Sequence, residues 1–376
     1  METNAREIMA KRLGQRAAEG NLRNLQYENK LHDFSSNDYL GFARSIFLKQ
    51  MIKEEQEKYP YAFLGATGSR LLSGNTRFVE KLENELADIH QSPAGLIFNS
   101  GYTANTSLFS CLPQKNDTVI CDELIHASVI DGIRMSFAKR LKFRHNDLED
   151  LESKIIRSTG LVYVAVESVY SMNGDLADLL EIARICRSHG AHLIVDEAHA
   201  FGVFGTGLVD MLEIRSAVFA RVITFGKALG MHGAIILGSV LLRDYLINFA
   251  RPFIFSTALP FVDLLSIRLA YQELLAHPNY RKTLQRKCSL FKDNMPPQEQ
   301  LRSSINPSAI QCVFVQGNPH VLRFSQLLQT HGFDVRAIRS PAVPVGKERL
   351  RVCIHTHNSD QAIIDLCRAF HQFSKP

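Results

Sequence analysis

The stretch LIVDEAHAFG contains two side chains that could act together in catalysis, Asp196 and His199. Its central letters Asp-Glu-Ala-His also mark a class of nucleic-acid motors, in which an aspartate at the end of a strand handles magnesium. Such a motor also needs a phosphate-binding loop of the form G-x-x-x-x-G-K-S/T. The chain has no such loop, because Gly226-Lys227 is followed by Ala228. The sequence therefore excludes the motor, and Asp196 is expected to serve a different chemistry.

Other reactive side chains follow short apolar runs further along the chain. Glu167 and Ser171 lie at and after the run LVYVAVE, and Thr224 and Lys227 lie at and after the run RVITF. Where such runs are parallel strands, ligands bind beyond their carboxyl ends. We therefore expect acids, an imidazole, hydroxyls and a lysine to meet at one edge of a sheet.

The stretch NSGYTAN, residues 99–105, follows another apolar run, GLIF. A glycine that opens a helix there leaves free backbone N–H groups that suit a phosphate. Pyridoxal phosphate requires a lysine that bonds to its aldehyde, a carboxylate for its pyridinium nitrogen and donors for its phosphate. The sequence thus favours this cofactor, and it predicts no metal site.

The elements that must position these side chains alternate between strands and helices. Apolar runs occupy residues 95–98, 118–121, 161–167, 192–196, 221–225 and 234–238, with helical patterns at 103–112, 126–139 and 178–189 between them. Strands that are apolar on both faces and separated by helices indicate a mostly parallel central sheet covered by helices. The predicted fold class is therefore α/β.

The pattern changes after residue 257, which predicts a division of the chain into three parts. Residues 1–45 form an N-terminal segment, and residues 46–257 form a large cofactor-binding domain. Residues 258–376 form a smaller α+β C-terminal domain, which is expected to take up the N-terminal segment as well.

Composition limits the partners and the compartment. The 376 residues carry a formal net charge of +5, and the basic stretches are short and lack interleaved aromatic residues, so no nucleic-acid partner is expected. The seven cysteines form no C-x-x-C pair, which indicates reduced thiols and a cytoplasmic location. No apolar run reaches membrane-spanning length, and the N-terminus lacks the pattern of a secretory signal, so no membrane association is expected.

Eight stretches of the chain resemble, in order, the motifs of the α-oxoamine synthases. These fold-type I pyridoxal-phosphate enzymes condense an amino acid with an acyl-CoA and release carbon dioxide. The resemblance implies an obligate homodimer whose active sites are shared between subunits. The stretches are HDFSSNDYLGFA (32–43), GSRLLSGNT (68–76), NSGYTAN (99–105), IHASVIDG (125–132), ESVYSMNGDLADL (167–179), VDEAHAFGVFGTGL (195–208), TFGKALG (224–230) and FSTALP (255–260).

The resemblance implies roles for the residues that carry the chemistry. Lys227 would bond to the cofactor aldehyde and, once displaced by the substrate, act as the base that removes a proton. Asp196 would pair with the pyridine nitrogen, His199 with the phenolic oxygen of the ring, and His126 would stack on the ring. Glu197 should point away from Asp196 by strand alternation, which favours a structural role.

The resemblance also implies a set of phosphate contacts. Gly101 and Tyr102 would bind the phosphate through backbone N–H groups, with help from Thr224. Ser256 and Thr257 would reach the phosphate from the other subunit. Glu167 and Ser171 would line the site beside the cofactor.

Four further residues are candidates for substrate binding. Arg339 is preferred for the amino-acid carboxylate, because a guanidinium group fits a carboxylate bidentately, and Arg351 is the competing candidate. Asn37 and Arg23 are expected at the substrate entrance.

Within the family, the chain most resembles the branch that joins L-alanine to a pimeloyl thioester, on CoA or on acyl-carrier protein. That reaction gives 8-amino-7-oxononanoate and carbon dioxide in biotin biosynthesis. The stretches TFGK, FARPFIFSTALP and AIRSPAVPVGKERLR carry this resemblance, whereas Ser340, Ala342 and Val79 depart from the expected pattern and leave the acyl donor open. The alternative is a member that makes 2-amino-3-ketobutyrate from glycine and acetyl-CoA, or one that uses a different acyl-CoA.

Overall fold

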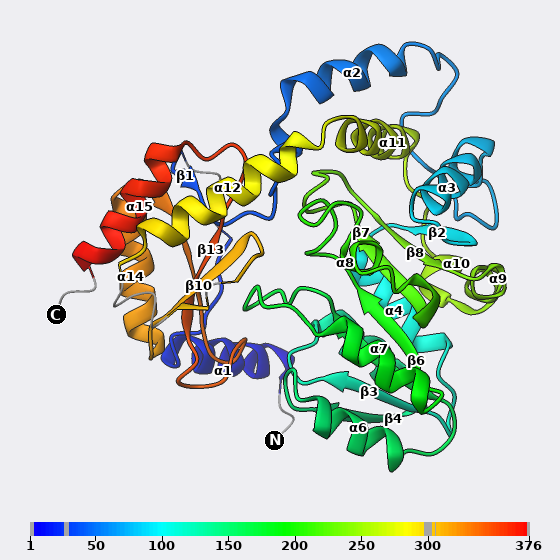
Figure 1. Ribbon diagram of the computed structural model, residues 1–376, viewed down its shortest axis with the longest axis horizontal. Coiled ribbons are helices and arrows are strands. Elements are labelled where there is room, and N and C mark those ends of the chain that lie inside the picture. Colours follow the sequence, from blue (N-terminus) through cyan, green and yellow to red (C-terminus); the bar gives the residue numbers. More distant parts are fainter. Residues whose placement is uncertain (1–3, 26–29, 297–302, 305, 374–376) are drawn as a thin grey trace. The chain divides into compact units, whose positions relative to one another are not determined.

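The computed structural model describes residues 4–25, 30–296, 303–304 and 306–373 (Figure 1). The chain divides into two units. The larger comprises residues 37–285 and 355–357, and the smaller comprises residues 1–36, 286–354 and 358–376. The boundary falls within helix α12 (Asn279–Asn294).

The large unit is built on a seven-stranded sheet with the strand order β2-β8-β7-β6-β5-β3-β4. The strands β3 to β7 run parallel to their neighbours, and only β8 is antiparallel, to both β2 and β7. The predicted α/β class is therefore confirmed. The strands are β2 (Ala94–Phe98), β3 (Thr118–Asp122), β4 (Lys139–Phe143), β5 (Val162–Glu167), β6 (His192–Asp196), β7 (Val218–Thr224) and β8 (Ala234–Gly238).

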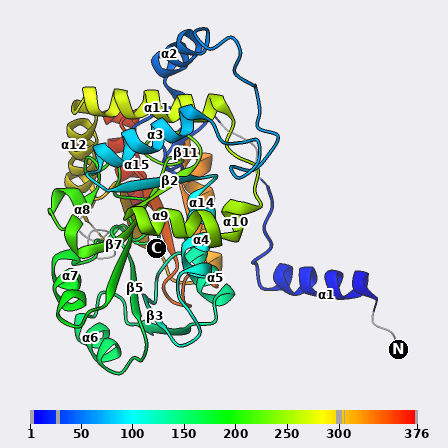
Figure 2. The same cartoon turned by 90° about the vertical axis from the view of Figure 1, so that its right-hand side faces the viewer.

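Helices cover both faces of this sheet, as its apolar strands require. Figure 2 shows α4 and α5 on one side of the strands and α6 and α7 on the other. The helices of this unit are α2 (Ile46–Gln56), α3 (Arg77–Ile89), α4 (Gly101–Cys111), α5 (Ala127–Met135), α6 (Leu148–Ile156), α7 (Leu179–Ser188), α8 (Leu208–Met211), α9 (Val240–Phe249), α10 (Arg251–Ile254) and α11 (Phe261–Ala276), with 3-10 turns η1 (Phe42–Arg44) and η2 (Arg215–Ala217).

Local sequence signals explain where several of these helices begin and end. The side chain of Asp178 accepts the N–H of Glu181 and caps α7, and the chain leaves that helix through Gly190 at a φ of 66°. Ser100 caps α4 in the same way, by accepting the N–H of Thr103. The start of α4 is therefore held firmly at the edge of the sheet where the site is expected.

Strand β4 was not predicted. Its sequence is KRLKF, of which only Phe143 is buried, and it pairs only with β3 at the edge of the sheet. Charged side chains are common on edge strands, because they discourage pairing with other chains. The run therefore lacked the apolar signal on which the other strands were identified, and α5 correspondingly ends at Met135 rather than near residue 139.

The smaller unit contains a four-stranded antiparallel sheet with the order β12-β13-β10-β9 and a two-stranded parallel pair, β1 with β11. Residues 1–36 of the predicted N-terminal segment, which supply β1, belong to this unit as expected, whereas residues 37–45 belong to the large unit. The elements are α1 (Ala5–Ala18), β1 (His32–Asp33), β9 (Ser303–Ser304), β10 (Ile310–Phe314), α14 (Asn318–Thr330), β11 (Phe333–Asp334), β12 (Arg336–Ile338), β13 (Arg349–Cys353) and α15 (Asp360–Phe373).

The observed boundary differs from the predicted one, which placed residues 258–376 in the C-terminal domain. Residues 258–285 belong to the large unit, because α11 packs against α2 and α3 and buries Leu265, Ile267 and Tyr271. The change of sequence pattern after residue 257 marks the end of the strand–helix alternation, whereas packing decides to which unit the next helix belongs.

Candidate active site

The carboxyl ends of four neighbouring strands present polar side chains at one edge of the large sheet. Asp122 ends β3, Glu167 ends β5, Asp196 ends β6 and Thr224 ends β7. Glu167 and Asp196 lie opposite each other in the register of β5 and β6. This convergence was expected from the order of the apolar runs, and it places two carboxylates side by side.

Asp196 is 7% exposed and is held by hydrogen bonds to both carboxylate oxygens. Asn105 Nδ2 donates to Asp196 Oδ2 at 2.7 Å, and the backbone N–H of Ala198 donates to Oδ1 at 2.9 Å. Asn105 Nδ2 also lies 3.0 Å from the hydroxyl of Ser128. These contacts fix the direction in which the carboxylate points, as a partner for a ring nitrogen requires.

Asn105 was not among the predicted site residues. It occupies the fifth position of α4, in the same motif as the glycine that begins the helix. Its side chain is 2% exposed, and its Oδ1 has no hydrogen-bond partner within the part of the chain that the structure describes. A polar amide at an otherwise apolar, core-facing helical position was the available signal.

His126 precedes α5, and its Nδ1 accepts the N–H of Ser128 at 3.2 Å. The same Nδ1 lies 2.7 Å from the Ser128 hydroxyl. Burial lowers the pKa of His126, and the positive charge of Lys227 lowers it further against the opposing effect of Asp196. The ring is therefore neutral with its proton on Nε2, which suits a flat surface for stacking.

Glu167 is buried beside Asp196, and the backbone N–H of Ser171 donates to its Oε2 at 3.1 Å. Burial, followed by the negative charge of Asp196, raises the pKa of Glu167 to about 8. At neutral pH Glu167 is therefore mostly protonated. The predicted neighbours Glu167 and Ser171 do meet in the structure.

His145 links the end of β3 to the loop that carries Ser171. His145 Nδ1 lies 3.0 Å from Asp122 Oδ1, and its Nε2 lies 2.5 Å from Asp175 Oδ2. The ring also meets Tyr170 edge-on, with centroids 4.5 Å apart. Burial lowers the pKa of His145, but the bonds to the two aspartates outweigh burial and raise the pKa to about 10.

Lys227 lies in the turn between β7 and β8, which ends at Gly230 with a φ of 67°. A side chain at Gly230 would overlap the backbone N of Ala43 at 2.3 Å, so the turn can only approach the 42–43 segment with glycine there. Lys227 Nζ lies 2.7 Å from His199 Nε2. The structure thus brings together the lysine and the histidine that were predicted to flank the cofactor.

A further residue extends this contact on the other side of the imidazole. The hydroxyl of Tyr39 lies 2.7 Å from His199 Nδ1 and donates to Asn37 Oδ1 at 3.0 Å. Tyr39 is fully buried and His199 is 4% exposed. Asn37 is therefore linked to His199 through Tyr39, a residue of the same motif that was not among the predicted ones, and its position at the substrate entrance stays a prediction.

The start of α4 and the end of β7 are neighbours. A Cβ atom placed on Gly101 would lie 3.4 Å from Thr224 Oγ1. Thr224 Oγ1 itself donates to the carbonyl of Gly233 at 3.2 Å. The first N–H groups of a helix, here those of Gly101 and Tyr102, have no partner within the helix. The two predicted sources of phosphate contacts, the start of α4 and the side chain of Thr224, therefore lie next to each other.

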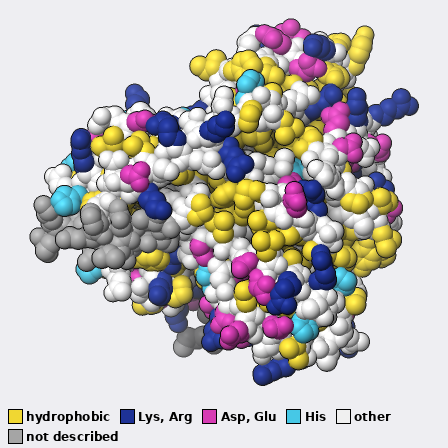
Figure 3. All heavy atoms as spheres, viewed as in Figure 1, with side chains coloured by type: hydrophobic (Ala, Val, Ile, Leu, Met, Phe, Trp, Pro, Cys, Tyr) yellow, Lys and Arg dark blue, Asp and Glu magenta, His cyan; other side chains and the backbone are white. Residues whose placement is uncertain are grey.

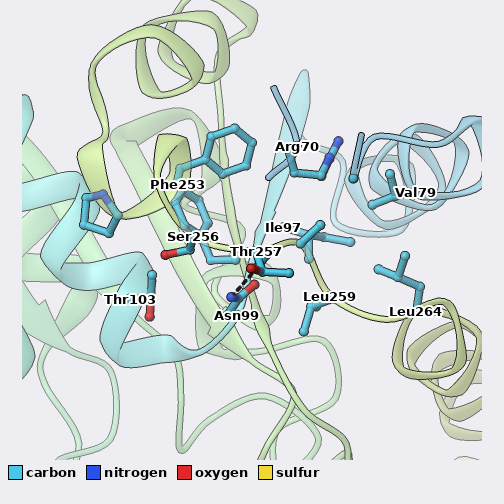
Figure 4. Close-up of a pocket in the computed structure, with 14 residues that line it drawn as sticks. Arg70, Val79, Ile97, Asn99, Thr103, Phe253, Ser256, Thr257, Leu259 and Leu264 are labelled. Carbon is cyan, nitrogen blue, oxygen red and sulfur yellow. Dashed lines mark hydrogen bonds between the residues drawn. The ribbon is translucent and has the colours of Figure 1, made fainter. Parts of the chain in front are cut away.

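Ser256 and Thr257 lie in the segment after α10 and line a pocket with Asn99, Thr103 and Arg70 (Figure 4). Asn99 Nδ2 donates to the carbonyl of Thr257 at 2.8 Å. The segment is also joined by an isolated bridge between Thr257 and Ser69. Their suggested contact with the phosphate of another subunit stays a prediction.

Glu197 has the structural role expected of it. It is fully buried, it accepts the backbone N–H of Val209 at 3.0 Å, and it forms an ion pair with Arg221. Arg221 in turn donates to Asp210 at 2.8 Å. A buried carboxylate requires such pairing, so Glu197 contributes to the support behind the site.

The predicted substrate arginines lie in the smaller unit. Arg23 and Arg339 line one pocket of about 190 Å³ together with Arg16, and Arg339 donates to the carbonyl of Gly20. Arg351 lies on β13, outside the lining of that pocket, with its NH1 2.9 Å from the sulfur of Cys353. The structure brings Arg23 and Arg339 together, and their role toward substrate stays a prediction.

Comparisons with known proteins agree with this architecture. A model of the aminotransferase class I and II family matches residues 29–370. The chain is 40% identical over 358 residues to 8-amino-7-oxononanoate synthase from Emericella nidulans, a match that covers 88% of this chain and 86% of that protein.

Solved structures show the same similarity in three dimensions. Serine palmitoyltransferase from S. paucimobilis with a bound PLP–myriocin aldimine has a TM-score of 0.87 and 25% identity, covering 97% of this chain and 96% of that one. The 8-amino-7-oxononanoate synthase of Francisella tularensis has a TM-score of 0.77 and 27% identity, covering 93% of this chain and 99% of that one.

Proposed function

The chain belongs to the aminotransferase class I and II family and, within it, to the α-oxoamine synthases, and we propose that it condenses L-alanine with a pimeloyl thioester. The products are 8-amino-7-oxononanoate, carbon dioxide and the free thiol of CoA or acyl-carrier protein, in biotin biosynthesis. The observation that carries the proposal is the 40% identity to a synthase of that name over 88% of the chain. The enzyme is a pyridoxal-phosphate-dependent acyltransferase.

The large unit fits pyridoxal phosphate. Asp196 presents a buried carboxylate whose orientation is fixed by Asn105 and Ala198, which suits a protonated ring nitrogen. The start of α4 at Gly101 lies against Thr224, which suits a phosphate. When bound, the cofactor supplies an electron-withdrawing ring that takes up the electron pair left on the α-carbon of the amino acid.

Different residues of the chain serve cofactor binding and proton transfer. Lys227 Nζ would bond to the cofactor aldehyde, and as a free amine it would be the base for the proton on the α-carbon of alanine. Asp196 would keep the ring nitrogen protonated through its negative charge. His126 would pack its ring on the cofactor and help to exclude water.

The amino-acid carboxylate requires a cation, and we assign it to Arg339, with Arg351 as the competing choice. Arg339 and Arg23 line the same pocket, which supplies positive charge for a carboxylate. Substitution of each arginine by glutamine tests the choice. Substitution of the residue that binds the carboxylate should raise the KM for alanine far more than the KM for the acyl thioester.

We infer that the active enzyme is a homodimer. Large apolar side chains are exposed in residues 61–72 and near Ser256, and hydrophobic groups gather at the surface around α2 and α11 (Figure 3). Tyr61 is 95% exposed and Phe255 is 72% exposed, which is costly for a monomer. A second subunit that covers this surface would also bring Ser256 and Thr257 to the neighbouring phosphate.

None of the helices in the described ranges is long and apolar enough to cross a membrane.

Serine is the second candidate for the amino acid. The serine palmitoyltransferase structure resembles the chain more closely in backbone than the synthase of Francisella tularensis does, with a TM-score of 0.87 against 0.77. Alanine is preferred because the relative with 40% sequence identity carries the synthase name.

Turnover assays of the purified, cofactor-loaded enzyme decide between the candidates. Alanine, glycine and serine are each paired with pimeloyl-CoA, acetyl-CoA and palmitoyl-CoA, and carbon dioxide release is measured. We expect the highest kcat/KM for alanine with pimeloyl-CoA. A higher value for glycine with acetyl-CoA, or for serine with palmitoyl-CoA, would replace the proposed substrate pair.

A further inference from the structure

A chain of hydrogen bonds runs from Lys227 to Asn37 through two buried side chains. Lys227 Nζ lies 2.7 Å from His199 Nε2, and His199 Nδ1 lies 2.7 Å from the hydroxyl of Tyr39. The hydroxyl of Tyr39 donates to Asn37 Oδ1 at 3.0 Å. All four residues lie in the large unit, and the two central ones are almost wholly shielded from water.

The chemistry of the two ends determines the direction of these bonds. A carboxamide oxygen only accepts, so the single proton of the Tyr39 hydroxyl is used toward Asn37. The Tyr39 oxygen must then accept, and His199 Nδ1 must carry the proton that is donated to it. An ammonium group only donates, so His199 Nε2 accepts from Lys227. Both ends require the same tautomer of His199.

The backbone and ring of Tyr39 are held independently of this hydroxyl. The N–H of Thr356 donates to the carbonyl of Tyr39 at 2.9 Å, and the Thr356 hydroxyl donates to the carbonyl of Leu40 at 2.6 Å. The Tyr39 ring stacks on His355 with centroids 6.4 Å apart. A phenylalanine at position 39 can therefore keep the packing and lose only the oxygen.

We propose that Tyr39 is a positioning residue that holds His199 as the Nδ1–H tautomer, so that Nε2 can take a proton from Lys227. The step moves one proton from Lys227 Nζ to His199 Nε2 and leaves a neutral amine and an imidazolium. The Nδ1–H of that imidazolium stays bonded to the Tyr39 oxygen, and no other bond forms or breaks. A neutral amine is the form of Lys227 that can bond to an aldehyde.

This inference rests on the proposed role of Lys227, but it is tested without substrate. Nitrogen NMR of the cofactor-free protein with isotope-labelled histidine reports which ring nitrogen of His199 is protonated, and a His199→Asn variant assigns the signal. We expect the proton on Nδ1 in the unsubstituted protein. A proton on Nε2 with none on Nδ1 would overturn the proposal even if no variant folded.

Tyr39→Phe removes the acceptor for the Nδ1 proton. We expect His199 to shift toward the Nε2–H tautomer and the capture of pyridoxal phosphate by the cofactor-free protein to slow roughly tenfold, the effect of one lost hydrogen bond. Tyr271→Phe is the matched control, because its buried hydroxyl also bonds a histidine, His90 Nε2 at 3.1 Å. It should leave the His199 signals and the capture rate unchanged.

The outcomes separate this inference from the proposed function. An unchanged His199 tautomer and an unchanged capture rate in Tyr39→Phe refute the positioning role while Lys227 still takes up cofactor. If the unsubstituted protein captures no cofactor through Lys227, the proposed function fails first.

Discussion

Replacement of Asn105 by leucine tests whether the amide found between Asp196 and Ser128 is important for the site. The substitution keeps a side chain of similar size in a position that is 2% exposed, and it removes both hydrogen bonds of Nδ2. A hydrogen bond to a charged group contributes about 1.5–3 kcal/mol, and one between neutral groups about 0.5–1.5 kcal/mol.

The expected loss follows from these two bonds. Asp196 keeps the N–H of Ala198, and the buried leucine recovers part of the loss through apolar contacts, so we expect the free energy of unfolding to fall by about 2–3 kcal/mol. For a domain of this size, that corresponds to a fall in Tm of about 4–12 °C. The loss should appear in the cofactor-free protein by thermal and urea denaturation.

Ser107→Ala provides the control on the same helix. Ser107 is fully buried, and its hydroxyl has no partner among the described residues, so its removal should change the free energy of unfolding little. If Asn105→Leu is no less stable than Ser107→Ala, the bond to Asp196 contributes nothing to the site, and the reasoning is wrong.

Three further predictions concern ionisable groups of the site. Lys227→Ala should abolish both the absorbance of lysine-bound cofactor and turnover, and retained turnover would contradict the proposed role. The pKa of Glu167 is raised from 4.5 to about 8, so the free energy of unfolding should fall as pH rises from about 4.5 to about 8. Glu167→Gln should flatten this decline in urea denaturation. An unaltered pH dependence would argue against the buried acid pair. The pKa of His145 is raised from 6.5 to about 10, so its contribution is fully present below pH 6.5 and is lost as pH rises through about 10. The deficit of His145→Gln in unfolding free energy should therefore disappear above pH 10. A constant deficit would refute a charged His145 between the two aspartates.

Most of the sheet could be predicted, because its strands are buried on both faces and each bears a continuous apolar run. β4 was not predicted for the opposite reason, since it lies at the edge of the sheet and carries charged residues. The assignment of α11 to a unit also required the structure. The apolar residues of α11 are spread around the helix, so its sequence does not indicate which neighbours it packs against; in the structure they are α2 and α3.

The residues that end the strands were predictable for a geometric reason. Parallel strands place their carboxyl ends at one edge, so Glu167, Asp196 and Thr224 converge whatever the details of the packing. Lys227 and Gly101 follow strands directly and share this edge. For these positions, chain order and residue type were sufficient.

Asn105 and Tyr39 show what sequence order could not provide. Both lie within motifs that had been recognised, but their importance comes from contacts with residues 91 and 160 positions away. Hydrogen bonds over such separations depend on side-chain direction and distances of a few ångströms. The amino-acid sequence alone thus determined the α/β class, the edge of the sheet and the chemical types gathered there. Only the tertiary structure decided which buried amide orients Asp196 and which hydroxyl completes the path from Lys227, because those pairings arise when separate elements pack together.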